Sequence, residues 1–258
     1  MSWSTRRRLI IVLIILLAVS GAASFFILPY FLKDPTCSDG KKNGGESGVD
    51  CGGPCSSLCA AEVAPLKLIW TRPFKATAGI YDVLAYVENH NIDAAAKKII
   101  YKFSLYDESN VLVATRVGKT YVTPNGKIPI FEGNIRTGER VPRRAFFEVS
   151  GTPEWIKAPP KAITLSLGTR NITYEVLNGK SVVSATIFNP SSYSIANVEV
   201  TAILYDDKRN AFAVSKTLLE SVGKDSTRNV TFTWPSSFES EPARIEIIPR
   251  FDVFSVPF

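Results

Sequence analysis

Apolar and polar residues follow three successive patterns along this chain. The segment Leu9–Leu32 is apolar and uncharged over 24 residues. A helix rises about 1.5 Å per residue, so this segment would be about 36 Å long as a helix and could cross a bilayer. Residues 33–62 contain few large apolar side chains. Beyond them, short runs rich in Val, Ile, Thr, Tyr and Phe are bounded by Asn, Gly, Pro and Asp, which is typical of β-strands.

Alternation within the later runs predicts which side chains face a core. Every second residue is apolar in residues 97–107 and again in residues 196–206, so each strand should have one apolar and one mixed face. The expected core positions are Ile99, Tyr101, Phe103 and Leu105 in the first run, and Val198, Val200, Ala202 and Leu204 in the second.

The strand pattern occurs twice, about 100 residues apart. Each copy reads as a strand ending in Asn, a loop, a long strand ending in Leu-Tyr-Asp, a short turn and a further strand. About 95 residues of antiparallel strands per copy fit a β-sandwich of the immunoglobulin type. The matching positions are Asn89, Leu105, Tyr106 and Asp107 in the first copy, and Asn189, Leu204, Tyr205 and Asp206 in the second.

Prolines between the copies predict the domain boundary. The stretch Ser150–Lys161 contains three prolines that interrupt the strands. We therefore expect an all-β fold of two tandem immunoglobulin-like antiparallel β-sandwiches, at residues 63–160 and 161–258, that unfold separately. The sequence does not decide whether Ile163–Leu167 closes the first sandwich or opens the second.

Charges around the apolar segment predict its orientation. Arg6, Arg7 and Arg8 precede it, and only Lys33 and Asp34 follow, so the positive-inside rule places the N-terminus in the cytoplasm. The expected order is a basic cytoplasmic tail at residues 1–8, a transmembrane helix at residues 9–32, and the remainder outside. The protein should be a single-pass protein of the cytoplasmic membrane.

A cleaved signal peptide is the alternative interpretation of the same segment. Ser20, Gly21 and Ala22 are small residues of the kind that a signal peptidase accepts. The apolar run continues through Phe25–Leu28, whereas polar mature sequence normally follows a cleavage site. This continuation favours an uncleaved signal-anchor.

The collar, residues 33–62, contains all four cysteines of the chain, Cys37, Cys51, Cys55 and Cys59. Clustered cysteines just outside a membrane predict two disulfides, which a glycine-rich segment without a core needs for order. Three pairings are open. A zinc site of four thiolates is the alternative, although its usual C-x2-C spacing is absent.

Oxygen-bearing side chains in the collar make calcium a candidate ligand. Asp39, Asn43, Glu46 and Asp50 lie among glycines that permit tight turns around a hard cation. Asp, Asn and Gly also dominate ordinary turns, so a purely structural role is the alternative. No other cofactor is expected.

Two parts of the sequence resemble known bacterial families. The string DGKKNGGESGVDCGGPC resembles a cysteine motif, D-G-x-x-N-G-x-E-x-G-x-D-C-G-G-x-C, of bacterial secreted and surface proteins, which implies export. Phe103, Leu105, Tyr106 and Asp107 match the F-x-L-Y-D signature of an extracytoplasmic domain, whereas Ala202 replaces the Phe in the second copy. Both copies are also similar to the late-embryogenesis-abundant type-2 sandwich. The resemblance implies a fold without known catalytic residues.

Charge and histidine content exclude several function classes. Setting aside the three arginines of the tail leaves 27 of the 30 basic residues against 24 acidic ones, a weak basis for nucleic-acid binding. His90, the single histidine, disfavours His-dependent hydrolases and multi-His zinc sites. Because it follows a strand, His90 is expected to be a solvated loop residue.

These observations predict a non-enzymatic membrane-anchored protein of the cell envelope. Its sandwiches would serve protein contact or envelope organisation, with the membrane and other envelope proteins as partners. The first alternative is a binder of an apolar ligand or lipid in a sandwich cavity. The second is a carboxylate-based hydrolase, although no group of acidic residues in the sequence suggests one. The repeated Tyr-Asp could form a binding site, but we favour a structural role in which Asp accepts N–H groups of the following turn.

Overall fold

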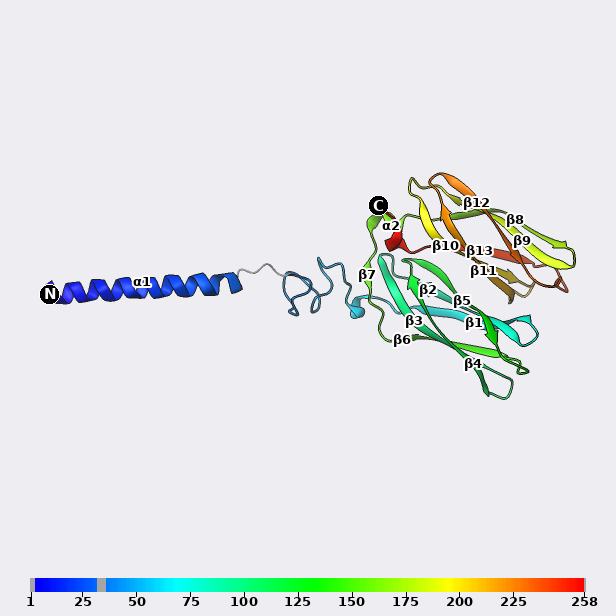
Figure 1. Cartoon of the computed structure of the whole chain (residues 1–258), viewed down its shortest axis with the longest axis horizontal. Helices are drawn as coiled ribbons and strands as arrows, with labels where there is room; N and C mark the ends of the chain where they lie inside the picture. Colours follow the sequence, from blue (N-terminus) through cyan, green and yellow to red (C-terminus); the bar gives the residue numbers. More distant parts are fainter. Residues whose placement is uncertain (1–2, 32–35, 258) are drawn as a thin grey trace. The chain divides into compact units, whose positions relative to one another are not determined.

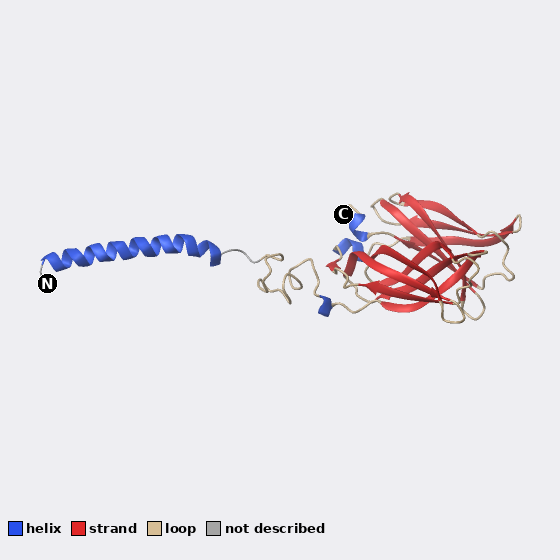
Figure 2. Ribbon diagram, turned by 60° about the horizontal axis from the view of Figure 1, so that its bottom comes forward, coloured by secondary structure: helices blue, strands red, loops and turns tan. Residues whose placement is uncertain are grey.

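The computed structural model describes residues 3–31 and 36–257. The chain forms two compact units that divide after Cys55. The first unit contains helix α1 and most of the collar, and the second contains the β-strands (Figures 1 and 2).

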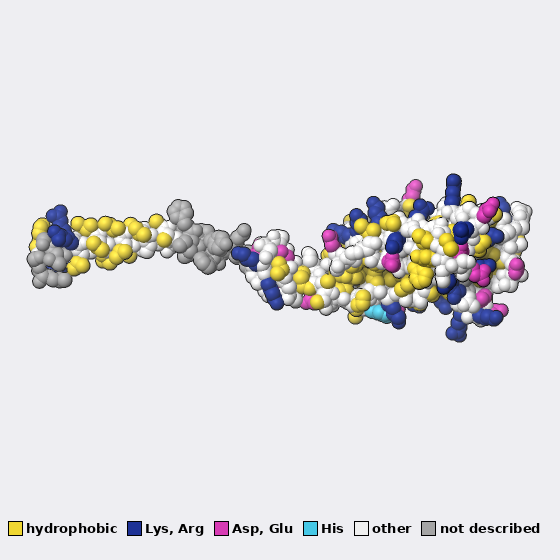
Figure 3. Space-filling model, turned by 90° about the horizontal axis from the view of Figure 1, so that it is seen from below, with side chains coloured by type: hydrophobic (Ala, Val, Ile, Leu, Met, Phe, Trp, Pro, Cys, Tyr) yellow, Lys and Arg dark blue, Asp and Glu magenta, His cyan; other side chains and the backbone are white. Residues whose placement is uncertain are grey.

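Helix α1 (Trp3–Phe31) contains most of the predicted membrane-spanning segment. Its stretch Arg6–Phe25 has a mean hydropathy of 2.4, and none of it is buried within the protein. Apolar side chains extend along the helix, with basic side chains near its N-terminal end (Figure 3). Because a helix that is apolar on all sides favours a lipid environment, α1 is suited to anchor the protein in a membrane. Leu32, the last residue of the predicted span, lies outside the described residues.

Disulfides, rather than regular secondary structure, hold the collar. One disulfide joins Cys37 to Cys55. Cys51 and Cys59 are also disulfide-bonded, so the prediction of disulfides is confirmed. No cysteine is free, and the zinc alternative therefore lacks its thiolates in this structure.

The first sandwich consists of two facing antiparallel sheets. The sheets have the strand orders β1-β2-β5 and β4-β3-β6, and a short strand β7 also pairs with β3. The strands are β1 (Lys67–Thr77), β2 (Ile80–Asn89), β3 (Ala94–Tyr106), β4 (Leu112–Val122), β5 (Gly126–Arg136), β6 (Arg144–Ser150) and β7 (Ile156–Lys157). A 3-10 turn, η1 (Ala60–Glu62), precedes them.

The strands of the second sandwich match the arrangement of β1–β6 in the first. Its sheets have the orders β8-β9-β12 and β11-β10-β13, again antiparallel. The strands are β8 (Gly168–Leu177), β9 (Lys180–Asn189), β10 (Ile195–Tyr205), β11 (Ala211–Val222), β12 (Ser226–Thr233) and β13 (Arg244–Arg250). The expected fold of two tandem immunoglobulin-like sandwiches is thus present.

Short helices connect and close the second sandwich. Helix α2 (Pro160–Ile163) follows the first sandwich, and η2 (Val253–Ser255) follows β13. The segment that the sequence left undecided forms the end of α2 and the loop into β8. Leu165 and Leu167 in this loop pack against the core of the second sandwich, so the segment belongs to the second sandwich by its contacts.

Each sandwich has its own apolar core, and the predicted alternation accounts for both. In β3, the side chains of Ile99, Tyr101, Phe103 and Leu105 are at most 3% exposed and lie in the first core. The four predicted residues of β10 are fully buried in the second core. These core positions are confirmed.

A third apolar cluster joins the sandwiches. We call it the sandwich interface. Leu84 and Tyr86 on β2 pack in it with Ile203 and Tyr205 on β10, and Leu84 and Ile203 are fully buried. The sheet β1-β2-β5 of the first sandwich therefore packs against the sheet β11-β10-β13 of the second. The proline-rich connection had suggested independent sandwiches and gave no indication of this contact.

Candidate functional site

The two repeated asparagines fix loops in both sandwiches. Asn89 is 1% exposed, and its Nδ2 donates hydrogen bonds to the carbonyls of Ala94 and Thr123, both at 2.8 Å. Asn189 is equally buried and donates to the carbonyls of Tyr193 and Gly223 at 2.7 and 2.9 Å. Each amide thereby ties the loop after its own strand to the end of a neighbouring strand. These contacts give both asparagines a structural role.

The repeated aspartates accept hydrogen bonds at the turns that follow them. Asp107 Oδ1 accepts from the N–H of Val111 at 2.9 Å, and Oδ2 lies 2.6 Å from Arg140 Nη1. Asp206 Oδ1 accepts from the N–H of Asn210 at 2.7 Å. These backbone hydrogen bonds hold the pKa of both carboxyl groups below the usual value. The aspartates thus make the contacts of turn-stabilising residues.

The tyrosines of the same motif differ in their surroundings. Both point away from their own core, because the adjacent leucines, Leu105 and Leu204, point into it. Tyr106 lies on an outer sheet face and packs edge-on against Phe146, with ring centroids 5.5 Å apart. Tyr205 is only 7% exposed, because the first sandwich covers it. Equivalent faces are therefore open in one sandwich and covered in the other.

One carboxylate accepts hydrogen bonds from both sandwiches. Glu246 on β13 accepts from the hydroxyl of Tyr86 at 2.8 Å and from that of Tyr205 at 2.9 Å. Burial and the nearby carboxylate raise the pKa of both tyrosines well above the usual range. Both hydroxyls therefore stay protonated and can donate at any physiological pH.

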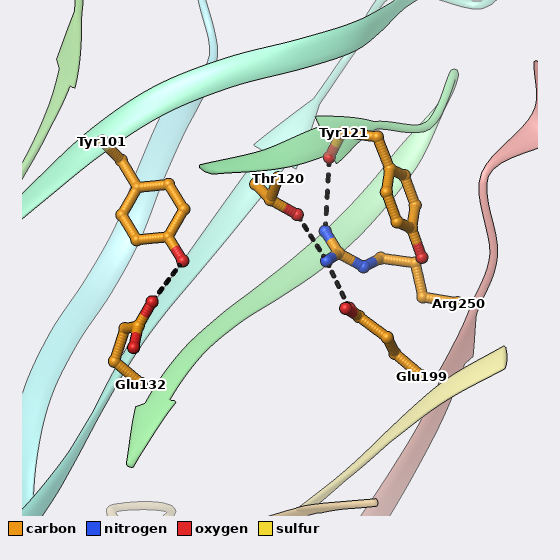
Figure 4. A network of polar contacts seen from close by, with 6 residues as sticks. All are labelled: Tyr101, Thr120, Tyr121, Glu132, Glu199 and Arg250. Carbon is orange, nitrogen blue, oxygen red and sulfur yellow. Dashed lines mark hydrogen bonds and ion pairs between the residues drawn. The ribbon is translucent and has the colours of Figure 1, made fainter. Parts of the chain in front are cut away.

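Arg250 is the most buried charged group of the sandwich contact, at 6% exposure. Its Nη2 lies 2.6 Å from Glu199 Oε2 and 2.7 Å from Thr120 Oγ1, and its guanidinium lies 4.3 Å from the ring centroid of Tyr121 (Figure 4). Thr120 and Tyr121 belong to β4, so Arg250 on the last strand of the second sandwich binds a strand of the first sandwich. Sequence analysis missed Arg250, because a single arginine in a strand carries no motif.

The charge of Glu199 depends on this arginine. Burial alone would raise the pKa of Glu199, but the charge and hydrogen bond of Arg250 outweigh it and hold the pKa below the usual value. Beside this network, Tyr101 donates a hydrogen bond to Glu132 at 2.8 Å (Figure 4). The ionised groups at this contact are thus paired in ways that stabilise the fold.

The collar residues proposed for calcium make hydrogen bonds within the collar. Asp50 accepts from the N–H groups of Asp39 and Gly40, at 2.9 and 3.0 Å. Glu46 accepts from the N–H groups of Asn43 and Asp50 at 3.3 Å, and Asp39 accepts from the amide of Asn43 at 2.9 Å. A turn-forming role accounts for these contacts, and calcium binding stays a prediction.

His90 and the collar sulfurs do not form a wider cluster of metal ligands in the described residues. The carboxylate of Glu46 lies near the sulfurs of Cys37 and Cys55, but these sulfurs are joined in a disulfide. His90 is about half exposed, as expected for a loop residue, and its Nε2 lies 3.3 Å from the carboxylate of Glu88.

The outer faces that the sandwich interface leaves uncovered differ in chemistry. We call the outer face of the sheet β4-β3-β6 the open face. Ile100, Val117 and Phe146 on it are 42%, 62% and 53% exposed. The opposite outer face, on the sheet β8-β9-β12, is polar, and Ser184 on it pairs with Thr231. The open face also carries the exposed ion pair Lys102–Glu148, so it is a mixed face with exposed apolar side chains. Such a face is more typical of a contact surface than a polar one.

Two cavities lie at the edges of the sandwiches rather than inside them. One, of about 330 Å³, borders the first core beside Leu66, Val149 and Trp155. The other, of about 300 Å³, lies between the two sandwiches beside Phe74 and Trp234. Buried apolar side chains lie between the sheets of each sandwich, and a ligand cavity there stays a prediction.

Comparison with known proteins gives no family assignment. No family model matches the chain, and no curated protein matches it. Among solved structures, the crystal structure of red sea bream transglutaminase is similar at 12% identity and a TM-score of 0.25. The match covers 74% of this chain and 30% of that chain. A likeness of this size carries no argument about activity.

Proposed function

We propose that the protein is a non-enzymatic protein of the cell envelope, held in the membrane by α1, that binds another envelope protein through the open face. In this proposal the two sandwiches are copies of one unit, and the N-terminus of α1 lies in the cytoplasm. The observation that carries the proposal is that equivalent sheet faces are covered in the second sandwich and exposed in the first. Ile203 and Tyr205 are covered by the first sandwich, whereas the equivalent face of the first sandwich is uncovered.

The rigid joining of the sandwiches supports a role in presentation. The interface combines the buried apolar cluster with the hydrogen bonds of Glu246 and Arg250 across the two sandwiches. Such a contact fixes the open face relative to the rest of the ectodomain. A fixed surface loses less conformational entropy on binding than a mobile one, so its partner can be held with fewer contacts.

Site-specific photocrosslinking tests the open face. A benzophenone amino acid would replace Val117 on the open face or, as a matched control, Thr231 on the polar face. Both side chains are exposed, so neither replacement should disturb a core. We expect a protein adduct in intact cells from position 117 and none from position 231. Adducts of equal yield from both positions, or from neither, would overturn the proposed contact.

Protease protection tests the anchor and its orientation. Protease added to intact spheroplasts should remove the two sandwiches and leave an N-terminal fragment containing α1 in the membrane. Protection of the two sandwiches from the added protease would reverse the proposed orientation. A soluble mature protein that begins near Ala23 would instead establish a cleaved signal peptide.

The cavity beside Trp155 supports a second candidate, the binding of a short apolar ligand. Its lining is mainly apolar, with Val63, Leu66, Val149 and Trp155 among its walls. About 330 Å³ is at the lower limit for ligand sites, which restricts the ligand to a short acyl chain or a small ring. Titration with octanoate, followed by tryptophan fluorescence of the parent and of Val149→Trp, tests this candidate. Equal responses of the two proteins would contradict it.

A further inference from the structure

The cavity between the sandwiches, which we call the inter-sandwich pocket, is lined by residues of both sandwiches. Strands β1 and β2 contribute from the first sandwich, and β11 and the loop after β12 contribute from the second. Its volume is about 300 Å³. The lining residues used below are Phe74, Asp82, Phe212, Trp234 and Phe238.

Aromatic rings form much of the wall. Phe238 packs against Phe212 and Trp234, with ring centroids 5.1 and 5.3 Å apart. Phe74 adds a buried ring from the first sandwich. The indole N–H of Trp234 is already used, because it donates to the carbonyl of Val214 at 3.3 Å. Aromatic rings attract cations to their π faces, so a ring-lined pocket is suited to a cation.

Asp82 brings a carboxylate to these rings. Its Oδ1 accepts a hydrogen bond from the N–H of Asn134 at 3.0 Å. Burial raises the pKa of Asp82, because few groups around it replace the lost water. The ion pairs among the described residues do not include Asp82. A cation in the pocket would give this carboxylate a positively charged partner.

The remaining features narrow the class of cation. A single carboxylate offers too few oxygen ligands for calcium or magnesium. The volume is at the lower limit for small-molecule sites, so the pocket suits one side chain or one small molecule.

We propose that the inter-sandwich pocket binds an alkylammonium or alkylguanidinium group, with its apolar stem against the rings and its charge beside Asp82. The group can come from a Lys or Arg side chain of a peptide or from a free small amine. The two sources present the same chemistry to the pocket. This site is separate from the open face, so the two proposals can fail independently.

Calorimetric titration of the full chain in mild detergent tests the proposal. The probes are butylammonium, the peptide acetyl-Gly-Lys-Gly-amide, and a peptide with norleucine in place of Lys as the neutral match. We expect both cationic probes to bind and the norleucine peptide to bind at least tenfold more weakly. Tighter binding of the Lys peptide than of butylammonium would assign the site to peptides, and the reverse order would assign it to free amines.

Variants separate the pocket from the rest of the protein. Asp82→Asn keeps an acceptor for the N–H of Asn134 but removes the charge, so cation affinity should fall at least tenfold. Trp234→Phe provides a second test if the first variant does not fold, and it should also weaken binding. Glu108→Gln, which removes an exposed carboxylate in the turn after β3, should bind as the parent does. Absence of binding at 10 mM probe, or equal binding by Asp82→Asn, would overturn the proposal.

Discussion

Breaking the ion pair between Arg250 and Glu199, which are cross-strand neighbours in the second sandwich, should reveal how much this buried pair beside the sandwich contact stabilises the fold. The proposed variants are Arg250→Met, Glu199→Gln and the double variant. Methionine keeps part of the apolar stem of arginine, so the change mainly removes the charge and its hydrogen bonds. The bonds that Arg250 makes to Thr120 and Tyr121 across the sandwich contact are lost with it.

The expected magnitude follows from burial and distance. Opposite charges about 4 Å apart attract by about 4 kcal/mol at an effective dielectric constant near 20. Desolvation offsets part of this attraction, and Glu199 is 27% exposed, so solvent screens a further part. We expect a coupling free energy of about 2 kcal/mol, and a loss of about 3 kcal/mol in unfolding free energy for Arg250→Met alone.

Urea unfolding of the full chain in mild detergent, followed by circular dichroism, measures this cycle. The exposed pair Lys102–Glu148 serves as a control and should show no resolvable coupling. The two single-variant losses at Arg250 and Glu199 should sum to more than the loss of the double variant. Losses that add within about 0.5 kcal/mol would refute the inferred coupling.

The same pair predicts a dependence of stability on pH. Because the pKa of Glu199 is lower in the folded protein, the folded state gains stability at pH values above the unfolded pKa, about 4.5. This stability is lost as pH falls through the lowered folded value. Without Arg250, burial should raise the folded pKa instead. In the Arg250→Met variant the contribution of Glu199 should therefore reverse in sign, so that stability is lost as pH rises through the raised folded pKa, which acid titrations of unfolding midpoints would detect.

Three further perturbations separate structural roles from binding roles. Asn89→Ala should lower the unfolding free energy by about 1 to 3 kcal/mol in a urea unfolding assay, because two buried carbonyls lose their donor. Parent-like stability would contradict the structural role of Asn89. Leu105→Ala should cost about 2 to 5 kcal/mol as a core truncation, and Asp107→Ala should cost less because it removes only hydrogen bonds and an ion pair at a surface turn; the opposite order would refute this assignment. Asp50→Ala should speed amide hydrogen exchange at Gly40 with or without calcium, and protection of the parent that appears only with calcium would favour a metal site.

The local pattern of apolar and polar residues was sufficient to predict the parts of the fold that depend on residues close together in sequence. The uncharged run predicted α1, and period-two alternation predicted the inward side chains of β3. The position of the cysteines beyond an apolar segment predicted disulfides, but four cysteines allow three pairings, so the link from Cys37 to Cys55 required the structure.

The sandwich interface left a signal in the sequence that alternation alone does not capture. Residues 83–87, Val-Leu-Ala-Tyr-Val, are apolar without interruption, and all five are buried. A strand that is apolar on both faces is covered on both faces. The equivalent strand β9 instead has Ser184 and Thr186 on its outer face, which marks that face as uncovered.

The inter-sandwich pocket could not be predicted in the same way. Phe74 and Asp82 are cross-strand neighbours in the β1–β2 hairpin of the first sandwich, whereas Phe212 and Trp234 belong to the second sandwich. No spacing rule relates residues that meet only when two domains pack at a particular angle. The angle itself depends on contacts such as those of Arg250 with β4.

The long stretch of chain between the first sandwich and Arg250 has a consequence for biosynthesis. The last strand of the first sandwich, β7, ends at Lys157, and the strand that carries the arginine ends at Arg250. At about 5 to 20 residues per second, a ribosome needs roughly 5 to 20 s to make the intervening segment. During this interval Leu84 and Tyr86 of the nascent chain have no covering partner. The first sandwich is then at its most prone to aggregation, and chaperones that hold emerging chains should bind it at this stage.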